Sequence, residues 1–103
     1  MTTLFYDYTD KVAFNKETAV KVILAETPHS RTTLWCLLPG QHIHPHVHAG
    51  DHIWVILEGT GRFLGDDPRE VNPGMVLIAP EGRAHGIDNT GMEGLVFLSI
   101  SAG

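Results

Sequence analysis

The sequence predicts an all-β domain of about ten short strands, and three observations carry this prediction. Stretches rich in β-branched and aromatic residues recur at short spacing along the chain. Glycine and proline separate these stretches so regularly that a helix of three turns would fit only before residue 20. The segment Asp10–Ala25 is too rich in Thr and Val to favour a helix there. Because antiparallel strands of this length must cover their edges, we expect the 103 residues to close into a barrel or nearly so.

Six stretches carry the residues that favour strands, and turn signals separate them. In chain order the predicted strands are Ala19–Ala25, Arg31–Leu38, His52–Leu57, Gly61–Leu64, Met75–Ala79 and Leu95–Ile100. The turn signals that separate them are Thr27-Pro28, Pro39-Gly40, Ala49-Gly50, Gly65-Asp66-Asp67-Pro68, Asn72-Pro73-Gly74 and Asn89-Thr90-Gly91. No internal repeat, low-complexity tract or charge run marks a linker, so we expect one domain over residues 1–103.

Composition and charge exclude several classes of function. The chain carries seven Lys and Arg against twelve Asp and Glu, a formal net charge of −5. The seven positive residues are scattered, so no face can assemble the basic stripe that nucleic-acid binding requires. No apolar run approaches the ~20 residues that span a bilayer, and Met1–Asp10 carries acids where a signal peptide would be basic. We therefore expect a cytoplasmic protein with neither nucleic acid nor a membrane as partner.

Cys36 is the only cysteine of the chain. A single cysteine excludes an internal disulfide and a multi-cysteine zinc site, and it suits a reducing compartment. We expect Cys36 to be a small buried hydrophobic residue.

Six of the seven histidines lie in two short segments. Five of them occupy even-numbered positions, so on a continuous strand they would point to one face of the sheet: His42, His44, His46, His48 and His52. Because Gly50 permits a bulge, a shared face is expected only within residues 42–48. Neutral imidazole is a common ligand of Zn, Fe, Cu, Ni and Mn, so such a face could bind a metal. The alternation is equally compatible with a polar outer face of a hairpin.

Two spaced motifs favour the metal-binding interpretation. The first contains Gly40, five residues, His46, one residue, His48, three residues, His52, six residues and Gly59. It resembles the first cupin motif, which usually has glutamate where this chain has His52. The second runs from Gly74 through Pro80, Gly82 and His85 to Asn89, and it matches every fixed position of the second cupin motif. The two motifs follow in the expected order with 14 residues between them.

The resemblance to small, single-domain bacterial cupins implies a conical double-stranded β-helix, or jelly-roll, barrel with a metal held inside it. Carried over residue by residue, it implies that one divalent transition metal per chain (Fe, Mn, Ni, Zn or Cu) is bound by His46, His48, His52 and His85. Gly59 and Gly82 stand where tight turns demand a positive φ. His42 and His44 lie just upstream, where we expect them to be solvated.

Histidine in the glutamate position changes the charge of the implied site. Four neutral imidazoles leave a divalent ion with a charge of +2, whereas three imidazoles and a carboxylate leave +1. We therefore expect a more Lewis-acidic site that attracts an anionic substrate. In an alternative register Asp51 would supply a carboxylate, but that register breaks the spacing to Gly40 and to Gly59.

The leading hypothesis is a metal-dependent enzyme, an oxygenase or a lyase or isomerase, that acts on a small organic molecule. The alternative is a non-catalytic ligand-binding or metal-sensing module. We expect an open inner pocket, and the candidates for its apolar wall are Trp54, Trp35, Phe63 and Phe97. The candidates for a general acid or base are Asp51, Glu58, Glu81 and Arg83.

The N-terminal segment has no obvious place in a minimal barrel. We expect residues 1–13 to form an edge strand or to cross to a second copy, because small cupins resemble one another in pairing their sheet edges. The expected assembly is therefore a homodimer.

Overall fold

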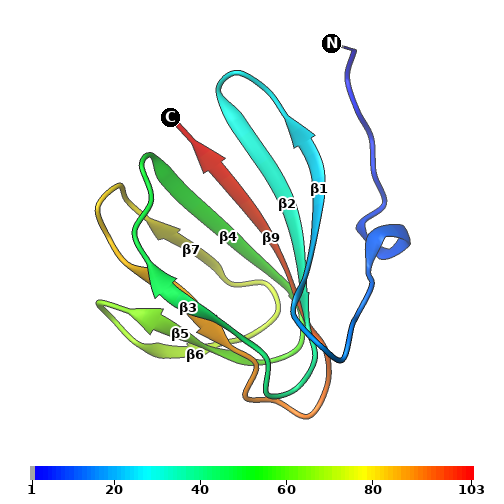
Figure 1. Cartoon of the computed structure of the whole chain (residues 1–103), viewed down its shortest axis with the longest axis vertical. Coiled ribbons are helices and arrows are strands. Elements are labelled where there is room, and N and C mark those ends of the chain that lie inside the picture. Colours follow the sequence, from blue (N-terminus) through cyan, green and yellow to red (C-terminus); the bar gives the residue numbers. More distant parts are fainter. Residues whose placement is uncertain (1) are drawn as a thin grey trace.

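Two antiparallel β-sheets form the computed structural model, which describes residues 2–103 (Figure 1). The five-stranded sheet has the order β1-β2-β9-β4-β7 and the four-stranded sheet the order β3-β8-β5-β6. The strands are β1 (Val20–Glu26), β2 (Ser30–Leu37), β3 (His42–His46), β4 (Asp51–Glu58), β5 (Gly61–Gly65), β6 (Arg69–Val71), β7 (Val76–Ala79), β8 (His85–Asp88) and β9 (Leu95–Ala102). The chain passes repeatedly between the sheets, which is the predicted double-stranded β-helix.

The predicted absence of a long helix is confirmed over residues 2–103. Their only helix is η1 (Tyr8–Lys11), a single 3-10 turn that Asp7 caps by accepting a hydrogen bond from the backbone N–H of Thr9. No helix in this part of the chain has the length and apolar character needed to cross a membrane. The six predicted strands are present as β1, β2, β4, β5, β7 and β9. The sequence analysis did not list β3, β6 and β8, which have five, three and four residues.

The main core lies between the two sheets. Side chains alternate along a regular strand, so every second one points to this interior wherever the pairing is regular. Eight buried side chains form one cluster there: Leu37, Trp54, Ile56, Phe63, Val71, Ile87, Leu95 and Phe97. This cluster fills one end of the interior with apolar side chains. The histidines lie at the other end, where they line a cavity.

A second cluster covers the outer face of the five-stranded sheet. Leu34, Cys36 and Val96 are fully buried there, and Tyr8 and Val12 of the N-terminal segment pack against them. Cys36 is thus the buried hydrophobic residue that the sequence predicts, and burial raises the pKa of its thiol. Its thiol is therefore held in the unreactive protonated form.

The N-terminal segment runs beside β1 of its own chain (Figure 1). The Tyr6 hydroxyl donates a hydrogen bond to the carbonyl oxygen of Leu24 at 2.8 Å, and the Tyr8 hydroxyl donates one to Glu58 Oε2 at 2.9 Å. The segment forms no strand over residues 2–13. Its expected crossing to a second copy stays a prediction.

Gly59 shows why the motif glycines are needed. Its φ is +82°, and an added Cβ would overlap the carbonyl oxygen of Gly94 and lie 2.9 Å from the Cα of Leu95. Gly82 also has a positive φ, of +85°. Both turns therefore require the left-handed backbone that glycine adopts without a steric penalty.

Candidate metal centre

His46 points to the interior because the pairing of β3 with β8 is irregular. Ile43 packs against the main core, whereas His42 and His44 are exposed. The register with β8 shifts between Ile43 and His46, so that His46 lies opposite His85. The prediction that residues 42–48 share one face is therefore wrong, because this shift breaks the alternation of a continuous strand. The expectation that His42 and His44 are solvated agrees with their exposure.

A glycine on the neighbouring strand makes room for the irregularity. A Cβ at Gly86 of β8 would lie 2.5 Å from the carbonyl oxygen of Ile43 and 2.6 Å from the nitrogen of Pro45. Pro45 has no N–H to donate, so it fits a position where the ladder is interrupted. Gly86 and Pro45 together permit the close approach that points His46 inward.

Four imidazole rings meet at this end of the interior. The ring centroids of His46 and His48 are 4.3 Å apart, and that of His85 is 5.0 Å from His46. The candidate ligand nitrogens of these three residues all lie within 4.8 Å of one another. His52, at the start of β4, is outside that group of three, but its ring lies 4.4 Å from His85 and 5.0 Å from His48. A three-histidine cluster that could hold a metal ion thus has a fourth imidazole beside it.

Backbone carbonyls orient two of the rings. Nδ1–H of His46 donates to the carbonyl oxygen of His44 at 2.7 Å, and Nδ1–H of His85 donates to that of Arg83 at 3.0 Å. A carbonyl can only accept, so each proton belongs on Nδ1 and each Nε2 keeps a free lone pair. This is the arrangement that metal-bound histidines usually have.

The environment of His85 Nε2 indicates whether the histidine cluster suits a metal ion. His85 is 2% exposed, and its Nε2 is buried without a hydrogen-bond partner in the described part of the chain. A buried nitrogen left unpaired costs free energy of about 1–3 kcal/mol. A cation among the imidazoles would satisfy it, so the donor set fits a divalent transition metal.

The cluster favours neutral imidazoles. Burial, followed by the positive charges that His85, His48 and His46 would carry, lowers the pKa of His52 to about 4. Burial also lowers the pKa of His48 and of His85. A metal can therefore bind these three side chains near pH 7 without first displacing protons from them.

A cavity of about 340 Å³ opens onto the cluster. Trp35 and Trp54 line it, and Trp54 Nε1–H donates to the Ser99 hydroxyl at 3.0 Å. Phe63 and Phe97, the other two aromatic candidates, lie in the core and do not line this cavity. A role in substrate binding stays a prediction for all four.

The structure places His52, rather than Asp51, beside the other histidines. Asp51 is exposed, and its Oδ1 accepts a hydrogen bond from the backbone N–H of Glu81 at 3.0 Å. None of the four candidate acid or base residues, Asp51, Glu58, Glu81 and Arg83, lines the cavity.

Sequence reasoning missed two residues of the cavity wall, Lys21 and Arg31. In the sequence they are two of seven scattered positive residues. Arg31 and Trp35 lie four residues apart on one predicted strand, which could have indicated that their side chains share a face. The place of Lys21 depends on its pairing with Trp35.

The fold, the two motifs and the histidine cluster define a cupin. The family described as Cupin domain matches residues 33–101, and the chain belongs to this family. The comparison with curated proteins found no match.

Solved structures of bacterial proteins are similar to nearly the whole chain. A conserved protein with a double-stranded β-helix domain from Klebsiella pneumoniae has 26% identity and a TM-score of 0.91, covering 98% of this chain and 90% of that one. The TT1209 protein from Thermus thermophilus has 29% identity and a TM-score of 0.90, covering 95% of each chain. An RmlC-like cupin protein from Desulfovibrio desulfuricans has 25% identity and a TM-score of 0.85, covering 97% of each chain.

Proposed function

We propose that this cupin is a metal-dependent enzyme acting on a small organic anion, of the oxygenase or the lyase and isomerase type. One divalent transition metal per chain, Fe, Mn, Ni, Zn or Cu, would be held by His46, His48 and His85, with His52 as the fourth ligand. The observation that carries the proposal is the buried, unpaired Nε2 of His85 among three other imidazoles.

The side chains of the cavity wall would bind and orient the substrate. When bound, the ion would act as a Lewis acid that polarises a substrate oxygen. Trp35 and Trp54 present apolar surface to the substrate beside the histidines. Trp54 is held in place by its hydrogen bond to the Ser99 hydroxyl and by an edge-to-face contact with the His85 ring. The centroids of these two rings are 5.4 Å apart. Four neutral ligands leave the full +2 charge of the ion to attract the anion.

A second candidate function is a ligand-binding or metal-sensing module without catalysis. It is favoured by the absence of any Asp or Glu from the cavity lining over residues 2–103. A reaction that needs a carboxylate as general base would lack one here. Turnover of candidate substrates by the metal-loaded protein distinguishes the two functions.

Elemental analysis tests the metal. Protein purified without added metal is expected to contain about one divalent ion per chain. His85→Ala should lose most of it, whereas the exposed His29→Ala should retain it. Equal metal content in both variants would contradict the proposed site.

The expected setting is the cytoplasm, where a lone buried thiol such as Cys36 stays reduced. The proposed partners are a small-molecule substrate and a second copy of the chain, with neither nucleic acid nor a membrane.

A further inference from the structure

The cavity wall formed by β1 and β2 carries two positive side chains. Lys21 and Arg31 both line the cavity, and no carboxylate within residues 2–103 does so. The residues of the lining thus carry two positive charges and no negative one, in a chain whose formal net charge is −5. A concave site lined by one sign of charge concentrates ligands of the opposite sign.

Strand register relates these cations to the histidines. Arg31 of β2 pairs with Ser101 of β9, and His52 of β4 pairs with Ser101 from the other side. Neighbouring strands lie about 4.8 Å apart, so the Cα atoms of Arg31 and His52 are about 10 Å apart. Arg31 and the four histidines line the same cavity, so one small molecule bound there can contact both the guanidinium and the imidazoles.

Lys21 reaches the same cavity from the edge strand. It pairs with Trp35, and its Nζ lies 5.7 Å from the centroid of the Trp35 ring. Thr33, which also lines the cavity, lies between Arg31 and Trp35 on the inner face of β2. The two long cationic side chains therefore flank a hydroxyl-bearing stretch of the wall.

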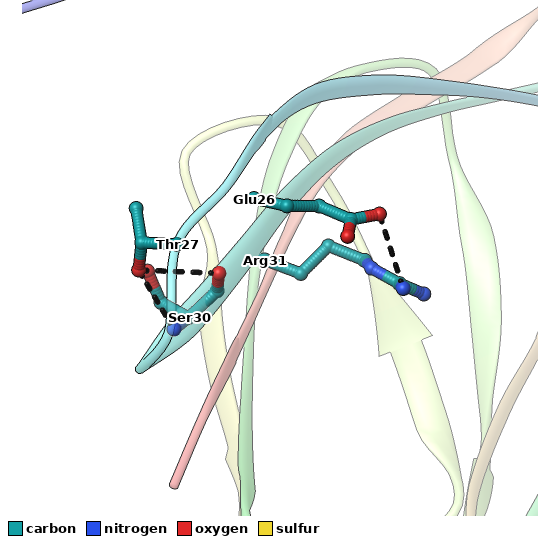
Figure 2. Close-up of polar contacts among 4 residues, drawn as sticks. All are labelled: Glu26, Thr27, Ser30 and Arg31. Carbon is teal, nitrogen blue, oxygen red and sulfur yellow. Dashed lines mark hydrogen bonds and ion pairs between the residues drawn. The ribbon is translucent and has the colours of Figure 1, made fainter. Parts of the chain in front are cut away.

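Arg31 keeps donors free for a ligand. Its Nη2 lies 3.1 Å from Glu26 Oε1, across the β1–β2 hairpin that Thr27 and Ser30 close by hydrogen bonds (Figure 2). Both side chains of this pair are about half exposed, so the pair contributes little stability. The guanidinium has five N–H donors, which leaves several for a second carboxylate.

We infer that Lys21 and Arg31 select a small dicarboxylate, with one carboxylate at these two cations and the other at the histidine cluster. This inference rests on the proposed function, because it assigns the substrate class of the same site. The cavity volume of about 340 Å³ is near the lower end for ligand pockets, which suits a short dianion. Trp35 and Trp54 would contact its apolar middle.

Calorimetry with glutarate tests the inference in metal-free and Zn²⁺-loaded protein. In both states the wild type should bind glutarate at least tenfold more tightly than the neutral glutaramide. Arg31→Gln and Lys21→Gln should each weaken glutarate binding about tenfold, and Arg31→Lys should recover part of the loss. Glu26→Gln should strengthen binding, because it removes the carboxylate that competes for Arg31.

Two control variants remove one positive charge each outside the cavity, namely Lys16→Gln and Arg69→Gln. They should bind glutarate as the wild type does. If Lys21→Gln and Arg31→Gln behave like these controls, or if the wild type does not prefer glutarate to glutaramide, the inference is wrong. If Zn²⁺ is not taken up but the metal-free protein shows the expected losses, the proposed function is contradicted and the dicarboxylate site stands.

Discussion

At the scale of single residues, the surroundings of each imidazole determine whether it can hold a metal. His46 and His85 donate Nδ1–H to backbone carbonyls, which fixes their tautomer and their direction. His42 and His44 are exposed on the same strand, and their Nε2 atoms lie 3.1 Å apart. The local backbone conformation therefore determines whether a histidine points into the metal centre or into solvent.

Substitution of His52 tests its role as the fourth ligand. His52→Glu should keep about one ion per chain, because a carboxylate can replace the imidazole, while lowering the charge of the site by one. The affinity of the His52→Glu variant for glutarate should fall, because the site is less positive. His52→Ala should reduce metal affinity by 10-fold or more, on the order of 1.4 kcal/mol. Metal content that is unaffected by His52→Ala but lost in Asp51→Ala would show that Asp51 is the ligand.

The lowered histidine pKa values predict a loss of stability in acid for the metal-free protein. The unfolded chain binds protons at His52 near the ordinary pKa of 6.5, whereas the folded chain binds one only near pH 4. The free energy of unfolding should therefore fall as the pH falls from about 6.5 to about 4. Urea titrations should show a weaker dependence in His52→Gln than in His29→Gln. Equal dependence in the two variants would contradict the pKa assignment.

At the scale of elements, the approach of β3 to β8 places His46 opposite His85. The motif spacing predicted the histidines that the structure brings together, because the motifs encode the turns that present them. The alternation of residues 42–48 did not predict the shift in strand pairing, because that shift depends on Gly86 of the partner strand as well as on Pro45 of β3. Lys21 and Arg31 were missed for a similar reason, since their common cavity wall depends on pairing between strands.

Gly86→Ala should destabilise the fold and the metal site together. The added Cβ would meet the backbone of Ile43 and Pro45, at an expected cost of roughly 1–3 kcal/mol in the free energy of unfolding. Metal affinity should fall because His46 would move.

Gly74→Ala is the matched control, because its added Cβ meets no atom within 4 Å. It should cost about 1–2 kcal/mol through its φ of +92° alone and leave metal affinity unchanged. Denaturant titration and metal titration measure the two effects. Unchanged metal affinity in Gly86→Ala would contradict the role given to the β3 irregularity.

At the scale of the whole molecule, the outer face of the five-stranded sheet is only partly covered. The N-terminal segment packs over the cluster of Leu34, Cys36 and Val96. Val76 and Ile78 on the edge strand β7 remain 59% and 66% exposed, and Phe5 is 88% exposed. Exposed apolar groups of this kind favour association with another surface.

We predict that the protein is a homodimer in solution. Light scattering should give about twice the chain mass of 11.3 kDa. Ile78→Lys should shift the mass toward that of one chain, because a charge would be buried in the interface, whereas Met92→Lys, at a residue 96% exposed and outside this sheet, should not. A wild-type protein that is monomeric at all concentrations would refute the prediction.

The position of a bound ion relative to His85 tests the central claim most directly. A crystal structure of the metal-loaded protein, with anomalous scattering to locate the ion, provides this measurement. The account predicts one ion per chain at roughly 2.0–2.3 Å from Nε2 of His85, with nitrogens of His46, His48 and His52 completing the protein ligands. An ion bound elsewhere, or a His85 Nε2 that stays unpaired in the presence of excess metal, would contradict the account.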